Sequence, residues 1–331
     1  MEGTLKETKV TKRSTVLQRL LQTPEVGVLV PLIAIILIFY LVNPVFLSFK
    51  NVASMLRAMS FIGIIALGQT FLMISGEFDL SVGSTAGLCA IVCAYLMVNA
   101  HWAIGPAILG GVLTGALVGL VNAFVVLQMG VPAFITTLGM LNIAKGINYL
   151  IDKGYSIYPL PQPISDFGLA SPLGISWSFF IFIVLAIIFD QILRRSVHGR
   201  TLYVVGGNKE VASLAGISPK LVKASGFVLV GAMSGLGGIL LMSRIITGNP
   251  TIGAGWELNV ISAVVIGGVS LFGGSGTIAG AVIGLMIMQA VSTGLVVIGV
   301  DPYWQTVAIG SIMILAVAID LLRRRAKTAS A

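Results

Sequence analysis

The sequence contains little charge for its length. Only 10% of its 331 residues are Asp, Glu, Lys or Arg, whereas 56% are hydrophobic. A soluble domain carries about a quarter charged residues, so this composition excludes one. The apolar runs between the charges are about 20 residues long, which is the length that a helix needs to cross roughly 30 Å of hydrocarbon. These observations predict an all-α integral membrane protein with many spans.

Cysteine and histidine are also scarce, with two of each. Cys89 and Cys93 are four residues apart within one apolar run and therefore share a helix face. A disulfide or metal site is one interpretation. The favoured one is that both are small buried hydrophobic residues, because buried free cysteine is ordinary. His101 and His198 lie at the boundaries of apolar runs, so we expect no metal site.

Two further absences narrow the function. The chain has no G-x-x-x-x-G-K-[ST] phosphate loop, so any energy from ATP must come through another subunit. The formal net charge of +8 is not accompanied by a basic patch with interleaved aromatic residues, which excludes nucleic-acid binding. The positive charge instead favours orientation in the bilayer and attraction to anionic lipid on the inner leaflet.

Ten segments are predicted to cross the membrane as helices of one domain, residues 26–321. Residues 1–25 and 322–331 are expected to be cytoplasmic ends, and the first apolar run is expected to be retained because no small-residue cleavage site follows it. The predicted spans are about 26–48, 59–75, 83–99, 104–128, 131–151, 176–193, 221–243, 256–273, 276–300 and 302–321.

Basic and aromatic residues predict the orientation. With both termini in the cytoplasm, 15 of the 20 Lys and Arg residues lie on the cytoplasmic side, as the positive-inside rule requires. Tryptophan prefers the membrane interface, and the same assignment places all four tryptophans at outer boundaries. They are Trp102, Trp177, Trp256 and Trp304.

The stretch ISGEFDLSVGS, residues 74–84, places two carboxylates between apolar runs. Gly76 is expected to end one helix, and Asp79 or Ser81 is expected to cap the next, which begins near Val82. Such a break at membrane depth would line a transport path. A plain turn at the inner surface is an equally good interpretation. A second glycine-rich break, residues 267–276, is predicted on the same side.

Glycines recur every four residues in two places, which predicts close helix packing in lipid. The two sets are Gly111, Gly115 and Gly119, and Gly276, Gly280 and Gly284.

The longest cytoplasmic connection, residues 194–220, contains the pattern of a short helix. Asn208 can cap it, Glu210 complements its positive end, and Gly216 can end it in a left-handed conformation. One face of this helix is apolar and consists of Val211, Leu214 and Ala215. Taken alone, a loop of this length is more often a solvated connector than a docking surface.

Five motifs, in order, resemble the permease subunits of monosaccharide ABC importers, the ribose, xylose and galactose class of the branched-chain amino acid and sugar permease family. They are GEFDLSVGS (76–84), FITTLGMLNIAKG (134–146), GRTLYVVGGNKEVASLAGI (199–217), VVIGGVSLFGGSGTIAGAVIG (264–284) and AIGSIMILAVAIDLLRRR (308–325). The resemblance covers residues 26–325 and favours a sugar substrate.

The resemblance implies the remaining expectations. They are ten helices arranged as in vitamin B12-type importers, a second permease subunit that shares the path, an ATP-binding subunit that uses ATP and Mg, an extracytoplasmic sugar-binding protein, and location in a bacterial cytoplasmic membrane. No cofactor and no catalytic residue is expected in this chain. The family match also favours docking of the ATPase on the 194–220 loop, through Gly199, Arg200, Asn208, Glu210, Val211, Leu214, Ala215 and Gly216.

Polar residues at span depth are the candidates for the sugar path, although each could equally bond to a neighbouring helix. They are Glu77, Asp79, Ser81, Asn122, Thr136, Thr137, Asn142, Asn259 and Gln289. Two other functions stay open on the residues alone. An ion-coupled transporter commonly has acidic or histidine relays in several helices, whereas here only Glu77 and Asp79 qualify. An intramembrane enzyme would need a catalytic pair, and only the 77–79 break offers one.

Overall fold

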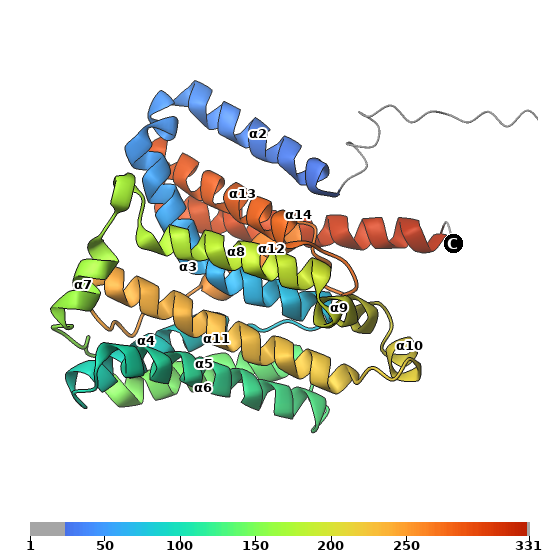
Figure 1. Ribbon diagram of the computed structural model, residues 1–331. Coiled ribbons are helices and arrows are strands. Elements are labelled where there is room, and N and C mark those ends of the chain that lie inside the picture. Colours follow the sequence, from blue (N-terminus) through green and yellow to red (C-terminus); the bar gives the residue numbers. More distant parts are fainter. Residues whose placement is uncertain (1–23, 330–331) are drawn as a thin grey trace, which may run out of the picture.

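The computed structural model describes residues 24–329, which form a bundle of long helices aligned along one direction (Figure 1). No β-strand occurs among these residues, and the only pairing of that type is an isolated bridge between Ile157 and Gly248. This confirms the predicted all-α fold. Most of the predicted 1–25 segment, and residues 330–331 of the predicted tail, lie outside the described residues.

Each of the ten predicted spans contains one α-helix. These helices are α2 (Pro24–Val42), α3 (Phe49–Ile74), α4 (Val82–Val98), α5 (Ile104–Leu127), α6 (Ala133–Asp152), α8 (Trp177–Arg195), α11 (Pro219–Ile245), α12 (Trp256–Ile266), α13 (Ile278–Val297) and α14 (Pro302–Ala329). Among the described residues, α3, α5, α8, α11 and α13 are both long and apolar enough to cross a membrane by themselves.

The two long connections contain further short elements and lie at opposite ends of the bundle (Figure 1). At one end are α7 (Gln162–Leu169) and the 3-10 turn η2 (Pro172–Gly174). At the other are α9 (Val197–Gly207) and α10 (Lys209–Leu214). A second 3-10 turn, η1 (Pro44–Leu47), joins α2 to α3. We call these ends of the bundle the α7 end and the α9–α10 end.

Helices α3 and α11 form the centre of the bundle. The most apolar stretches of α3 and α11 are 83% and 61% buried, compared with 28% in α5 and α8. Glycines let α11 approach α5 closely, since a β-carbon at Gly115 would clash with the Gly231 carbonyl and one at Gly119 with the Phe227 carbonyl. The predicted packing role of this glycine set is confirmed. In the second set, Gly280 and Gly284 pack against α12 and the loop after it, whereas Gly276 precedes α13.

Two predicted helix boundaries are wrong at the start of the chain. The first span was predicted to reach residue 48, but α2 ends at Val42 because Pro44 cannot continue the helix and Asn43 caps η1 instead. The second was predicted to begin at residue 59, but α3 begins at Phe49. Its first two turns include polar residues that the hydrophobicity pattern did not assign to a span.

The eighth span differs most from the prediction. It was expected to be one helix, residues 256–273, with Trp256 at the outer boundary. Instead α12 has only 11 residues and ends at Ile266, before Gly268, whose φ is +84°. Residues 246–255 form an unwound segment that descends along α4 until Gly253 touches Gly83, in the first turn of α4. Trp256 follows directly and therefore lies well below the α7 end.

The two cysteines, Cys89 and Cys93, are buried and free on α4, and Cys89 packs against Gly115 and Gly235. This agrees with their favoured interpretation as small core residues.

Candidate functional site

The break between α3 and α4 lies near the α9–α10 end. The last turn of α3 is closed by the Ser75 and Gly76 N–H groups, which donate to carbonyls of that turn. Gly76 has φ +87°, a left-handed conformation that glycine adopts at low cost, so it ends the helix as predicted. The chain then passes through Glu77 and Asp79 before α4 begins at Val82.

Asp79 is the centre of a buried hydrogen-bond cluster, which we call the Asp79 cluster. Its Oδ1 accepts from the Ser81 backbone N–H and from Ser81 Oγ, both at 2.6 Å. Asn122 of α5 donates from Nδ2 to Asp79 Oδ2 at 3.0 Å and to Ser81 Oγ at 3.1 Å. All three side chains are buried. The cluster therefore ties the start of α4 to α5.

The predicted capping of α4 by Asp79 or Ser81 is wrong. Ser81 occupies the N-cap position, but its side chain caps no N–H group of the helix. Its φ and ψ of −81° and −5° are helical, whereas a capping serine is extended, and its hydroxyl is already engaged with Asp79. Asp79 bonds to the N-cap residue itself, so its role is to join two helices.

Glu77 lies apart from this cluster. Its Oε1 accepts from Lys223 Nζ of α11 at 2.7 Å, and the two side chains are only 20% and 14% exposed. The two neighbouring carboxylates thus have different environments: Glu77 has a cationic partner, and Asp79 has neutral donors only. Sequence reasoning missed this pair because 146 residues separate its members.

The two predicted breaks meet each other at the α9–α10 end. Gly274 N–H donates to the Ile74 carbonyl at 2.9 Å, which joins the loop after α12 to the end of α3. Gly206 of α9 packs against the same carbonyl so closely that a β-carbon would clash with it. Tyr203 of α9 also donates from its hydroxyl to the Gly276 carbonyl at 2.7 Å. Helix α9 is therefore in direct contact with both breaks.

The other predicted path residues do not converge. Thr137 donates to the Ala133 carbonyl at 2.8 Å and Asn142 to the Leu138 carbonyl at 3.2 Å, both within α6. Gln289 donates to Thr293 within α13. Thr136 Oγ1 is buried with no partner among the described residues, and Asn259 is half-buried on α12. Of the nine predicted residues, the structure brings Asp79, Ser81 and Asn122 together.

The predicted short helix in the 194–220 connection exists as α10, and its end signals are confirmed. Asn208 Oδ1 accepts from the N–H groups of Glu210 at 2.9 Å and Val211 at 3.1 Å. At the other end Gly216 has φ +77°, its N–H donates to the Ser213 carbonyl, and Ile217 N–H donates to the Ala212 carbonyl. These two bonds are those of a Schellman motif.

Helix α10 presents its apolar face to the surroundings. Leu214 is 88% exposed and Val211 is 54% exposed, and Ala215 is exposed beside them. Ala212, on the other side of the helix, is fully buried and holds α10 to the bundle. We call Val211, Leu214 and Ala215 the α10 face.

Gly199 and Arg200, which were also predicted to contact the ATPase, differ in their exposure. Gly199 is buried, and a β-carbon there would clash with the Ile192 and Leu193 carbonyls at the end of α8. It therefore cannot contact a partner directly and instead permits the sharp joint between α8 and α9. Arg200 is exposed and donates to the Arg195 carbonyl at 3.4 Å.

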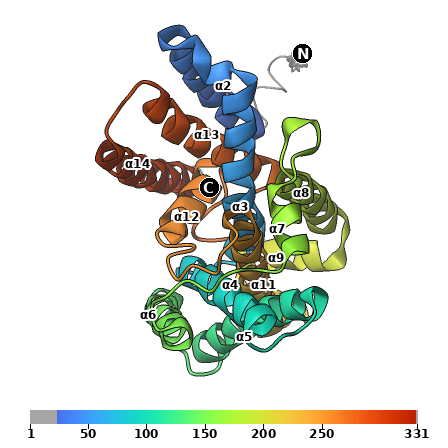
Figure 2. The ribbon, with the colours of Figure 1, turned by 90° about the vertical axis from the view of Figure 1, so that its left-hand side faces the viewer.

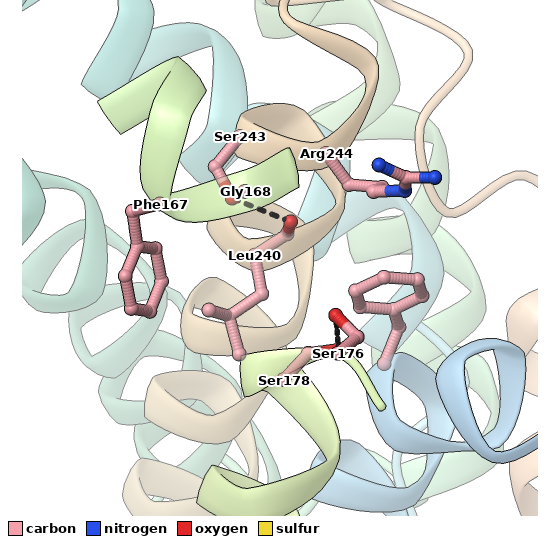
Figure 3. Close-up of a pocket in the computed structure, with 8 residues that line it drawn as sticks. Phe167, Gly168, Ser176, Ser178, Leu240, Ser243 and Arg244 are labelled. Carbon is pink, nitrogen blue, oxygen red and sulfur yellow. Dashed lines mark hydrogen bonds between the residues drawn. The ribbon is translucent and has the colours of Figure 1, made fainter. Parts of the chain in front are cut away.

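A crevice at the α7 end lies between α3, α7, α8 and α11 (Figure 3). Its hydroxyls bond to one another or to backbone: Ser176 and Ser178 are 3.0 Å apart, and Ser243 donates to the Leu240 carbonyl at 2.8 Å. The residues that line the crevice are Phe61, Phe167, Gly168, Ser176, Ser178, Leu240, Ser243 and Arg244.

Three polar residues near the unwound segment 246–255 were missed in the sequence. They are Lys145 and Asn148 on α6 and Glu257 on α12. Glu257 could have been found from the sequence, because it is a carboxylate at the second position of a predicted apolar span.

The sequence matches the protein family described as "Branched-chain amino acid transport system / permease component" over residues 51–317. The chain belongs to this family. Among similar curated proteins, the L-arabinose ABC transporter permease protein AraH of Azospirillum brasilense is 35% identical over 92% of this chain and 89% of its own length. The galactose/methyl galactoside import permease protein MglC of Salmonella typhimurium is 36% identical over 90% of this chain and 94% of its own length.

The ribose import permease protein RbsC of Escherichia coli K12 is 32% identical, over 88% of this permease and 92% of its own length. No solved structure shows a significant match to the permease. The predicted likeness to vitamin B12-type importers therefore stays a prediction.

Proposed function

We propose that this permease is the membrane-spanning subunit of an ABC importer that moves a monosaccharide across the bacterial cytoplasmic membrane. The observation that carries this proposal is the match, over nearly the whole chain, to permeases named for L-arabinose, galactose and ribose. ATP and Mg are used by a separate ATP-binding subunit. This chain contributes the path and has no catalytic residue of its own.

The exposed α10 face supports the proposed site of the ATP-binding subunit. A side chain as apolar as Leu214 gains about 1.5–3 kcal/mol from burial, so its 88% exposure is unfavourable unless a partner covers it. The Asn208 cap and the Schellman motif fix α10 before any partner binds, which lowers the entropy cost of docking. Through α9, which contacts both glycine-rich breaks, motion at α10 can be passed to α3 and the start of α13.

The proposed orientation of the bundle in the membrane indicates where the remaining partners bind. The α9–α10 end faces the cytoplasm together with both termini, and an extracytoplasmic sugar-binding protein delivers sugar at the α7 end. A second permease subunit completes the path. Of the seven Lys and Arg residues between Trp177 and Ile245, Arg244 lies at the α7 end. The other six support this orientation because they gather at the α9–α10 end, in accord with the positive-inside rule. They are Arg194, Arg195, Arg200, Lys209, Lys220 and Lys223.

No observation favours the alternative of an ion-coupled secondary transporter. Such a protein needs a carboxylate that can exchange its proton or sodium ion during transport. The two carboxylates that the sequence offered for this role are occupied, since Glu77 pairs with Lys223 and Asp79 accepts three hydrogen bonds. Glu257 on α12 is half-buried and stays available, so the reconstitution below distinguishes the two functions.

Reconstitution tests the proposed function. We expect vesicles that contain the permease, its ATP-binding subunit and its sugar-binding protein to take up labelled L-arabinose, D-galactose, D-ribose or D-allose only when ATP is present. Uptake should persist when proton and sodium gradients are abolished with ionophores. Uptake that follows an ion gradient and ignores ATP would contradict the proposal.

Cysteine labelling tests the orientation. We expect a cysteine at Asp166, exposed on α7, to react with an impermeant thiol reagent in intact cells, and a cysteine at Ser213 to react only after the cells are opened. The native Cys89 and Cys93 give little background because both are buried. Labelling of Ser213→Cys but not Asp166→Cys in intact cells would reverse the orientation.

A further inference from the structure

The unwound segment 246–255 brings polar groups to membrane depth. Its first part is fixed at the α7 end, where Gly248 and Ile157 exchange backbone hydrogen bonds of 2.8 and 3.0 Å. From there it runs along α4, with Gly248 against Ala94, the Ile252 carbonyl against Gly87, and Gly253 against Gly83. Residues 83 and 94 of a helix are about 16 Å apart along its axis. The segment therefore descends about half the thickness of the hydrocarbon before α12 begins.

The first turns of α4 and α12 meet where this segment ends. The first N–H groups of a helix have no partner within the helix, and that of Trp256 donates instead to the Gly253 carbonyl at 3.0 Å. Glu257, the second residue of α12, lies with its carboxylate against Gly83. It is only half-buried, and the nearest donor to it is its own backbone amide. It forms no side-chain hydrogen bond or ion pair with any residue between 24 and 329.

Helix α6 supplies a cation and an amide to the same place. Lys145 interacts electrostatically with Glu257 but is too far away for a direct ion pair. Asn148, one turn further along α6, is 2% exposed, and its Nδ2 lies beside Gly87 and donates to the Pro250 carbonyl at 2.9 Å. Its Oδ1 is buried without a hydrogen-bond partner in the described part of the chain. A buried acceptor that stays unpaired costs about 1–3 kcal/mol, which points to a ligand here.

These groups cannot face lipid. A charged side chain at membrane depth is costly in hydrocarbon, and an unwound backbone is tolerated there only inside protein or beside a water-filled cavity. Lys145 is exposed and Glu257 half-exposed in the single chain, on the side of the bundle where α6, α12 and α14 lie (Figure 2). This side must therefore face water or another protein surface.

From this arrangement we propose that Glu257 and Lys145 form a sugar subsite on the transport route, with Asn148 beside it. The inference rests on the proposed function and adds substrate-contacting residues to it. A carboxylate accepts hydrogen bonds from two neighbouring hydroxyls of a sugar, and an ammonium group donates to a third oxygen. Glu257 lies against Gly83 and Asn148 against Gly87, one turn along the same face of α4, so the carboxylate and the amide are neighbours. In the Asp79 cluster, Asp79 and Ser81 are bonded to each other and to Asn122 Nδ2, although Asn122 Oδ1 is also buried without a partner among the described residues.

The test measures which sugar hydroxyl each side chain recognises. The parent sugar is the one of the four tested sugars that the wild-type complex takes up fastest. The reconstituted complex is supplied with a saturating amount of binding protein. This binding protein is loaded either with the parent sugar or with one of its monodeoxy analogues. We expect at least one analogue to be transported about tenfold or more slowly than the parent by the wild type. Glu257→Ala should slow transport of the parent sugar by a similar factor and abolish the difference in rate between the parent and that analogue. Lys145→Ala should likewise abolish the difference in rate between the parent and an analogue that lacks one hydroxyl.

Asp190→Ala is the matched control, because it removes a carboxylate that pairs with Arg194 at 2.8 Å on the surface of α8 and should change neither rate. Glu257→Met, which nearly keeps the volume but offers no strong hydrogen-bond acceptor, covers the case in which the alanine variant does not assemble, and should show the same loss of preference. Discrimination that survives in Glu257 variants, whatever their rate, would overturn the inference, as would a wild type that transports every analogue at the parent's rate. A wild type that takes up none of the sugars would instead contradict the proposed function.

Discussion

Replacing Leu214 with aspartate is expected to abolish ATP-driven uptake while leaving the permease folded and in the membrane. The side chain is 88% exposed at the tip of α10, so the substitution disturbs no packing within this chain. If the ATP-binding subunit covers the α10 face, aspartate places an unpaired charge in an apolar contact, which costs several kcal/mol. A loss of about 3 kcal/mol weakens association by more than a hundredfold.

The measurement is retention of the ATP-binding subunit during purification, together with uptake and sugar-stimulated ATP hydrolysis in vesicles. Ser213→Asp is the control, since it adds the same charge to the same exposed helix but on the side away from Val211. We expect the control to retain the ATP-binding subunit. Equal retention and uptake in the Leu214→Asp variant would show that α10 is only a connector.

Disrupting the Asp79 cluster is expected to have the second large effect. In Asp79→Asn, an amide N–H₂ replaces the carboxylate oxygen that accepts from Asn122 Nδ2, so two donors face each other in a buried site. Each buried donor without an acceptor costs about 1–3 kcal/mol. We expect lower thermal stability in detergent and strongly reduced uptake. Glu77→Gln should be milder, because the glutamine carbonyl can still accept from Lys223 Nζ and the pair is partly exposed.

A reciprocal exchange separates the cluster from a general effect of charge. Asn122→Asp alone should also be harmful, since it places two carboxylates against each other. The double variant Asp79→Asn with Asn122→Asp restores one carboxylate and one amide at the same separation and should recover stability and uptake in part. Additive losses in the double variant would mean that the contact between residues 79 and 122 is not what matters.

The local signals in the sequence were read correctly where they depend on neighbouring residues. Asn208 and Gly216 bound α10 as predicted, because capping involves groups within a few residues of each other. Gly76 ends α3 for the same reason. The order of apolar segments and the lack of charge were likewise enough to predict an all-helical membrane protein.

Predictions failed where a second segment decides the outcome. Asp79 was expected to cap α4, but its two oxygens accept from the N-cap residue Ser81 and from Asn122, which is 43 residues away. Asn142 and Gln289 each bond within their own helix, and their position on the path stays a prediction. A polar residue in an apolar span has the same sequence signature whether it faces a ligand, its own backbone or another helix.

The sequence by itself determined that this protein lies in a lipid bilayer, that it is helical, and where α10 begins and ends. Composition and capping are local properties of the chain. The tertiary structure alone decided which polar groups meet. Close backbone contacts at Gly83, Gly87 and Gly253 hold the segment 246–255 unwound along α4, so that Trp256 and Glu257 lie at membrane depth and not at the boundary. The turn residues of this segment, ITGNPTIGAG, already placed it outside every predicted span. Its path into the bundle was not visible in the sequence, because that path depends on contacts with α4.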